Sequence, residues 1–261
     1  MKVACIQLSS GENYEKNFKS IIKYTYEAIK KKSDLIITPE TSSIITSDKK
    51  ILYANTYTMQ KDPLVKEIKK ISKKFKKWIL IGSLPIKDGK KFRNRSVMIG
   101  PSGKIVKYYD KINMFDIKLT KKETHKESKT FIPGSKLVSV NLPWGRLGLT
   151  ICFDLRFPEI YRNLSKKNLN FISVPSAFTK ITGQKHWITL LKARAIENFC
   201  YIFAPNQTGK NTKKRETFGH SVIISPDGKI LKIKKSGTGV IYENIDPKIS
   251  FKLRKVIPSL I

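Results

Sequence analysis

The chain alternates short apolar runs, rich in β-branched residues, with longer segments of helical periodicity from end to end. Short runs bounded by Pro, Asp or Asn predict buried strands, and apolar residues spaced three or four apart predict amphipathic helices. The predicted strands are 2–9, 34–40, 78–86, 169–178 and 200–207. The predicted helices are 13–31, 62–77, 156–168 and 184–199. Such alternation predicts an α/β layered fold.

Three further segments predict β-hairpins. They are 93–111, which turns at Pro-Ser-Gly, 136–152, which turns at Pro-Trp-Gly, and 220–233, which turns at Pro-Asp-Gly. Hairpins within an α/β pattern indicate mixed rather than purely parallel sheets. A length of 261 residues is enough to bury a full core, and no linker, repeat or low-complexity block interrupts it. We therefore expect residues 1–261 to form a single domain.

The net charge of +32 raises the question of a nucleic-acid partner. Only eight of the 52 basic residues are arginines, and the lysines are scattered over nearly every segment. Because specific phosphate and base recognition favours Arg, a solvated Lys-rich surface is the preferred interpretation. We expect no nucleic-acid partner, although a basic nucleic-acid-binding protein remains the alternative from another functional class.

The remaining composition points to the cytoplasm. No apolar run reaches the roughly 18 residues of a membrane-spanning helix, and the N-terminus predicts a strand rather than a signal peptide. The three cysteines, Cys5, Cys152 and Cys200, are widely spaced and odd in number. This pattern indicates neither a disulfide framework nor a zinc site, and it favours a reducing compartment.

Three chemically complementary residues follow predicted strands. Glu40 follows "LIITP", Lys111 follows "KIVKYYD" and Cys152 follows "GLTI". Reactive side chains in open α/β folds gather beyond the carboxyl ends of strands, so these three can converge on one pocket. A thiol supplies a nucleophile, a carboxylate can move its proton to a leaving amine, and an ammonium can stabilise an oxyanion. The duller interpretation makes Cys152 core filler, Glu40 a cap and Lys111 a surface lysine.

The chain resembles the nitrilase superfamily of carbon–nitrogen hydrolases in "LIITPE" at 35–40, "YYDKINMFD" at 108–116 and "GLTICFDLRFPE" at 148–159. The resemblance implies an αββα four-layer sandwich and a Glu40, Lys111 and Cys152 triad, with Glu127 supporting the triad from behind. It also implies that a thioester forms on Cys152. In the step before the thioester, Lys111 and the backbone N–H of Phe153 are implied to hold the oxyanion. The resemblance implies no metal or organic cofactor. It does imply a homodimer.

Within this family, 175–201 and 213–228 resemble most closely the deaminated glutathione amidases and, less closely, the ω-amidases. The resemblance implies a carboxylate-bearing 2-oxo acid amide as substrate, with deaminated glutathione giving 2-oxoglutarate and Cys-Gly. The ω-amides 2-oxoglutaramate and 2-oxosuccinamate, carbamoyl compounds and, more weakly, nitriles are the alternatives.

Such a substrate needs anion-binding groups, because a planar guanidinium suits a carboxylate. The candidates are Arg156, Thr179, Thr182 and Arg215. Arg156 could instead pair with Glu159.

Several other residues have structural interpretations. Arg194 and Glu197, three apart on one predicted helix, suggest an ion pair. His125, His186 and His220 lack neighbours at ligand spacing, so metal binding is not expected. Cys5 and Cys200 lie in apolar runs and are expected in the core.

Overall fold

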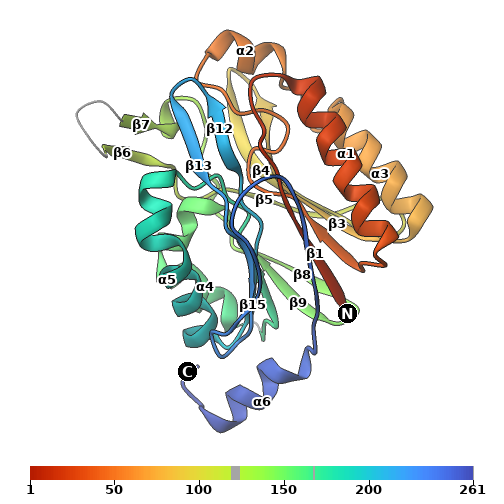
Figure 1. Ribbon diagram of the computed structural model, residues 1–261, viewed down its shortest axis with the longest axis vertical. Helices are drawn as coiled ribbons and strands as arrows, with labels where there is room; N and C mark the ends of the chain where they lie inside the picture. Colours follow the sequence, from red (N-terminus) through yellow and green to blue (C-terminus); the bar gives the residue numbers. More distant parts are fainter. Residues whose placement is uncertain (119–123, 167, 261) are drawn as a thin grey trace.

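Two six-stranded β-sheets packed between layers of helices form the body of the computed structural model (Figure 1). The structure describes residues 1–118, 124–166 and 168–260. In spatial order the first sheet contains β16 (Gly239–Asn244), β1 (Lys2–Gln7), β2 (Leu35–Ile37), β3 (Trp78–Asp88), β4 (Lys91–Ile99) and β5 (Ile105–Asp110). The second contains β15 (Ile230–Lys234), β14 (Ser221–Ile224), β11 (Tyr201–Ala204), β10 (Phe171–Ser173), β9 (Gly145–Leu149) and β8 (Val138–Leu142).

Each sheet has three parallel strands at its centre and antiparallel strands on both sides. In the first sheet β1, β2 and β3 are parallel, and in the second β9, β10 and β11 are parallel. The hairpins β3–β4–β5, β8–β9 and β14–β15 supply antiparallel pairs, and so do β1 with β16 and β11 with β14. Because the central strands of a sheet share one direction, their carboxyl ends open at one edge, where loops can assemble a site.

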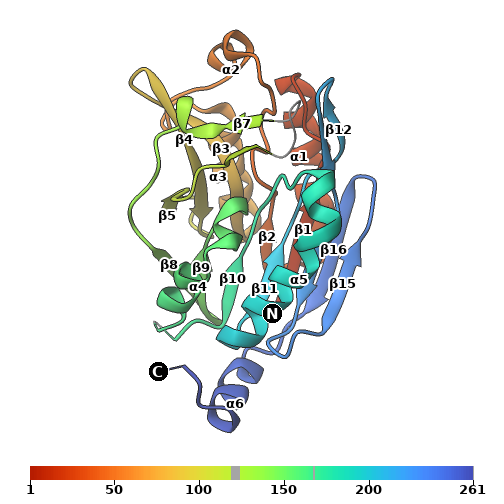
Figure 2. The same cartoon turned by 90° about the vertical axis from the view of Figure 1, so that its left-hand side faces the viewer.

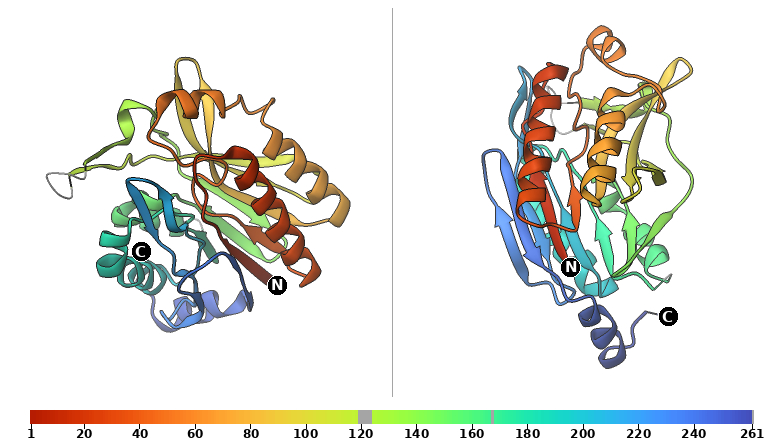
Figure 3. Two further views of the ribbon diagram at one scale, coloured as in Figure 1. Left: turned by 45° about the horizontal axis from the view of Figure 1, so that its top comes forward. Right: turned by 90° about the vertical axis from the view of Figure 1, so that its right-hand side faces the viewer.

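Helices cover the outer face of each sheet. The helices are α1 (Tyr14–Lys30), α2 (Lys49–Ala54), α3 (Pro63–Phe75), α4 (Pro158–Ser165), α5 (Lys180–Asn198) and α6 (Lys248–Val256). Helices α1 and α3 lie on the first sheet, and α4 and α5 lie on the second, as the turned views show (Figures 2 and 3). Helix α6 lies at the end of the molecule opposite α2 (Figure 1).

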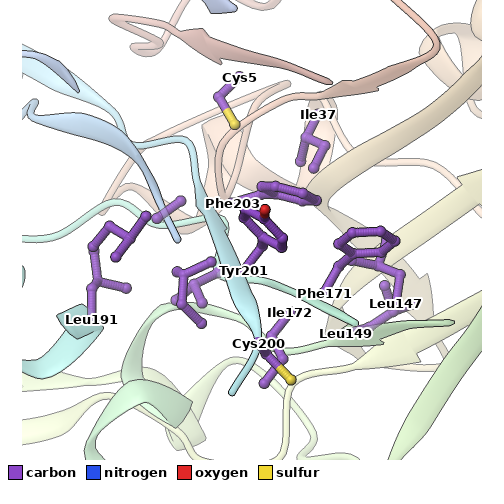
Figure 4. Packing of buried hydrophobic residues seen from close by; sticks show 14 of the residues in the cluster. Cys5, Ile37, Leu147, Leu149, Phe171, Ile172, Leu191, Cys200, Tyr201 and Phe203 are labelled. Atoms are coloured by element: carbon purple, nitrogen blue, oxygen red, sulfur yellow. The ribbon is translucent and has the colours of Figure 1, made fainter. Parts of the chain in front are cut away.

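The core divides at the first sheet, because successive side chains of a strand point to opposite faces. In β2, Leu35 and Ile37 pack between the sheets, whereas Ile36 packs under α1 and α3. Between the sheets, Cys5 and Ile37 lie opposite Phe203 and Tyr201 of β11 (Figure 4). A strand buried on both faces reads as a continuous apolar run, which explains the "LII" of β2.

The predicted αββα class is confirmed, and so are the placements of Cys5 and Cys200 in the core. The sequence reading missed the small hairpins β6 (Asp116–Lys118)–β7 (Thr124–Lys126) and β12 (Thr208–Thr212)–β13 (Arg215–Phe218), and also α2, β16 and α6. Most of these elements are short or polar, so their apolar periodicity is weak. No helix within the described ranges is both long enough and apolar enough to span a membrane.

Candidate active site

The three residues singled out at strand ends lie together in the fold. Glu40 follows β2 and Lys111 follows β5 in one sheet, while Cys152 follows β9 in the other. All three side chains are buried, and the Lys111 Nζ donates to Glu40 Oε1 at 2.8 Å. The Cys152 thiol lies close enough to the Glu40 carboxylate for the two groups to shift each other's pKa. The site therefore lies across the two sheets, and neither sheet alone contains it.

Both oxygens of Glu40 are held in place. Oε1 accepts from Lys111 Nζ and, at 3.0 Å, from Asn94 Nδ2, while Oε2 accepts from the Ala177 N–H at 2.9 Å. Gln207 donates to the Glu40 backbone carbonyl at 2.9 Å. A buried carboxylate with this many donors has a defined position and orientation.

Glu127 stands on the other side of Lys111. Its Oε2 accepts from Lys111 Nζ at 2.8 Å and from the Phe115 N–H at 2.7 Å, and its Oε1 accepts from Asn94 Nδ2 at 3.0 Å. Lys111 thus lies between two carboxylates, and Asn94 bridges the same two. This arrangement fixes the ammonium while neutralising its charge.

Cys152 occupies a strained turn. Its φ of 46° lies in the left-handed region, which a non-glycine residue rarely adopts and which often marks functional sites. The turn continues as a 3-10 helix, η2 (Cys152–Arg156), before α4 begins at Pro158. The helix predicted at 156–168 thus begins at Pro158, and the 3-10 turn η2 lies between it and the strand β9.

Two buried side chains hold the turn. Asp154 accepts from the Ile151 N–H at 2.9 Å, from the Tyr109 hydroxyl at 2.8 Å and from both nitrogens of Asn113 at 3.0 Å. Because Tyr109 and Asn113 flank Lys111, Asp154 ties the turn of the thiol to the segment of the ammonium.

Arg194 holds the other side of this turn. Its guanidinium donates to the Leu155 carbonyl at 2.8 and 3.1 Å, and it pairs with Glu197 at 3.0 Å. The expected Arg194–Glu197 ion pair is therefore confirmed. The contact with Leu155 gives that pair a further role in positioning the turn.

Burial and charge set the protonation states. Burial, reinforced by the negative charge of Glu40, raises the pKa of the Cys152 thiol despite the opposing effect of Lys111. Burial tends to raise the pKa of Glu40 too, but the charge and hydrogen bond of Lys111 outweigh it, so that pKa is lowered. For Lys111 burial opposes the charged form, and the two carboxylates overcome it and raise the pKa. At neutral pH the resting site therefore holds a thiol, a carboxylate and an ammonium.

A cavity of about 370 Å³ opens onto this group. Glu40, Lys111, Cys152 and Glu127 line it, together with Phe115, Phe153 and Phe178. The volume lies within the range of small-molecule sites. Phe153 follows the thiol directly in η2, and among the described residues its N–H makes no hydrogen bond to a backbone carbonyl outside this turn.

The structure treats the anion-binding candidates differently. Arg215 lines the cavity and donates to the Ala177 carbonyl at 3.0 Å, and its buried Nε has no partner among the described residues. Thr179 and Thr182 also line it, but Thr179 is the N-cap of α5 and its hydroxyl lies 2.9 Å from that of Thr182. Arg156 is not part of the cavity lining.

Instead, the Arg156 guanidinium lies behind the cavity wall. It lies over the rings of Phe153 and Phe178, and both of its Nη atoms are 3.3 Å from His186 Nδ1. The pairing with Glu159 considered above is replaced by this contact with His186.

Sequence reasoning missed Asn94 and Asp154, which hold the carboxylates and the turn. Asn94 is the fourth residue of β4 and its amide is buried, an unusual position for Asn in a strand and the one available signal. No group of three or more His, Cys, Asp or Glu side chains able to hold a metal ion occurs in the part of the chain that the structure describes.

Comparison with known proteins agrees with this architecture. A family model described as carbon-nitrogen hydrolase matches residues 2–251. The deaminated glutathione amidase of Yersinia enterocolitica is 36% identical over 265 residues, which cover 99% of this chain and 91% of the relative.

Two solved structures are also similar. The Caenorhabditis elegans NitFhit protein has a TM-score of 0.90 at 32% identity, and the match covers 98% of this chain but only 63% of that longer one. Saccharomyces cerevisiae Nit3, described as a member of the nitrilase superfamily, has a TM-score of 0.88 at 26% identity, with 99% and 94% covered. The chain thus belongs to the carbon-nitrogen hydrolase family.

Proposed function

We propose that this chain hydrolyses a linear amide through a thioester on Cys152. The observation that carries the proposal is the convergence of a carboxylate, an ammonium and a thiol in one buried cavity. Glu40 is the general base, and Lys111 with the Phe153 N–H holds the oxyanion. Each group matches a separate requirement of acyl transfer.

The protonation states dictate the order of events. Because the pKa of the thiol is raised and the pKa of Glu40 is lowered, the proton moves from sulfur to Glu40 only as the C–S bond forms. The carbonyl oxygen then carries the negative charge beside Lys111. Glu40 passes the proton to the nitrogen, the C–N bond breaks and the amine leaves. Glu40 next takes a proton from water, which attacks the thioester and releases a carboxylic acid while Cys152 regains its thiol.

The substrate we propose is a carboxylate-bearing 2-oxo acid amide, deaminated glutathione, which gives 2-oxoglutarate and Cys-Gly. The name of the Yersinia relative supports this choice. Arg215 supports it as well, because its guanidinium lines the cavity and is close enough to Glu40 to lower the pKa of that carboxyl. Its buried Nε also has no hydrogen-bond partner within the described ranges. We assign the carboxylate of the 2-oxo acid portion to Arg215, with the paired hydroxyls of Thr179 and Thr182 on the same wall.

We also propose a homodimer in the reducing cytoplasm. Exposed apolar side chains occur on α5, on α6 and at the residue that follows α6, namely Ile196, Phe251, Val256 and Ile257. The three buried thiols are free. Sedimentation at micromolar concentration tests the dimer, since a stable monomer would contradict it.

Mass spectrometry of the products tests the chemistry. Purified protein is mixed with deaminated glutathione and with 2-oxoglutaramate, and Cys152→Ala is run beside it. We expect faster cleavage of the first compound and no turnover in the variant, whose thermal unfolding should match the wild type. Preference for 2-oxoglutaramate would make the enzyme an ω-amidase, and substantial activity in Cys152→Ala would refute the mechanism.

A further inference from the structure

The cavity continues beyond the triad toward α2. Its outer part is walled by the loop 44–49, by α2 and by the tip of the β12–β13 hairpin, which lie at one end of the molecule (Figure 1). Hydrogen bonds join these walls, because Asn211 donates to the Ser10 carbonyl and the Gly11 carbonyl accepts from Ile45. Apolar side chains also line this cavity: Ile44, Leu52, Pro85 and Phe131.

The charges along the wall of the cavity are not balanced. Among the described residues, the lining of the whole cavity contains five cationic side chains and three carboxylates. The cations are Lys49, Lys111, Lys126, Lys214 and Arg215, and the carboxylates are Glu40, Asp48 and Glu127. Two positive charges therefore remain.

Most of the eight have partners within the protein. Lys111 lies between Glu40 and Glu127, and Asp48 caps α2 by accepting from the backbone of Lys50 and Ile51. Lys126 interacts with the carboxylate of Asp116, its neighbour across β6–β7.

Lys49 and Lys214 are different. Both side chains are exposed at the mouth of the cavity, and neither has an ion pair with any residue of the described ranges. Ammonium groups that line a cavity without a counter-charge attract an anionic ligand. Arg215, the third cation of this part, already has a place on the acyl side of the scissile bond, next to Glu40.

We propose that Lys49 and Lys214 form a second anion subsite, which recognises a carboxylate on the leaving amine. This inference rests on the proposed amide hydrolysis at Cys152. With the scissile carbon at the thiol and the acyl carboxylate at Arg215, the leaving group crosses the apolar lining and ends between the two lysines. The preferred substrates are then N-substituted amides whose leaving group is a small peptide or amino acid with a free carboxylate. Binding energy gained at this distance from the thiol can be used to raise kcat/KM.

The test compares two substrates that differ only at this carboxylate. Deaminated glutathione is set against its analogue with a carboxamide in place of the glycine carboxylate, and the ratio of the two kcat/KM values is measured. The variants are Lys49→Gln, Lys214→Gln and the double variant. Lys50→Gln and Lys213→Gln are matched controls, since both lysines are exposed neighbours outside the cavity lining. All of these side chains are exposed, so every variant should fold.

We expect the wild type to prefer the acid, and each cavity substitution to lower the ratio about 2- to 5-fold, the range of a single exposed ion pair. Added salt should reduce the preference of the wild type, because exposed charges are screened. The control variants should keep the wild-type ratio.

An unchanged ratio in the double variant would refute the subsite. An equal fall in the controls would also refute it and indicate general attraction by the basic surface. If the wild type cleaves neither compound while iodoacetamide still labels Cys152, the proposed substrate is wrong and the subsite falls with it. That result appears in the wild type alone, so the two failures are distinguishable.

Discussion

Replacing Glu127 with Gln tests whether the carboxylate behind Lys111 serves catalysis. The substitution keeps the size of the side chain and removes one of the two charges that neutralise the ammonium. At 2.8 Å the gross attraction between Lys111 and Glu127 is about 6 kcal/mol for an effective dielectric constant of 20. A neutral amide oxygen at this position retains part of the attraction. We therefore expect the free energy of unfolding to fall by about 2–3 kcal/mol, the usual contribution of a hydrogen bond to a charged group.

The hydrogen bonds predict the structural consequence. Glu127 accepts from Lys111, Phe115 and Asn94. A glutamine oxygen at the Oε2 position leaves its NH₂ facing the Asn94 NH₂, and the buried Oδ1 of Asn94 has no partner within the described chain. Asn94 can satisfy the new donor by turning its amide over, but it then withdraws its donor from Glu40. Lys111 also moves toward Glu40, its one remaining partner carboxylate, and away from the oxyanion.

The assay is the steady-state rate on the cleaved amide together with thermal unfolding. We expect kcat to fall about 100-fold, near the cost of losing one oxyanion donor, and Tm to fall by about 5 °C. Glu216→Gln is the matched control, because its 2.9 Å pair with Lys180 is half-exposed on both sides and its loss should change Tm by less than about 2 °C. A lowered Tm with wild-type kcat would show that Glu127 only stabilises the fold, and no change in either would refute the network.

Three further changes test the framework of the site. Asp154→Asn leaves one accepting oxygen, where the carboxylate has two, for four donors. We expect the free energy of unfolding to fall by about 3 kcal/mol and kcat to fall with it. A Tm within about 2 °C of the wild type would contradict this. Gly82→Ala places a Cβ 1.8 Å from the Thr38 carbonyl oxygen and 2.6 Å from the Cβ of Pro175. We expect the free energy of unfolding to fall by at least about 3 kcal/mol, or no folded protein to form. A normal yield with a normal Tm would show that the strand ends can separate. Burial raises the pKa of Asp62, the N-cap of α3, from 3.8 to about 6. The folded state holds this proton more tightly, so its contribution to stability is full below pH 3.8 and is lost as the pH rises through about 6, a total of about 3 kcal/mol. Asp62→Asn keeps an acceptor for the Val65 N–H and should remove this pH dependence, and parallel Tm–pH curves for variant and wild type would contradict the assignment.

The sequence by itself determined the layered class and singled out Glu40, Lys111 and Cys152 as a candidate site. Burial of a strand or helix face imposes a period on consecutive residues, so β2 and α3 can be read from their apolar positions alone. The motifs around Glu40, Lys111 and Cys152 are continuous segments, and each residue follows its own strand. These signals are local, which is why one sequence is enough to find them.

The tertiary structure alone decided which groups surround the triad. Arg156 and Arg215 are indistinguishable as anion-binding candidates in the sequence, yet one lies behind two phenylalanine rings and the other lines the cavity. Asn94 reaches Glu40 across 54 positions and Glu127 across 33. Neither contact leaves a periodic trace, because a hydrogen bond between distant segments depends on which strands and loops lie side by side in the fold and not on the neighbours of either residue in the chain.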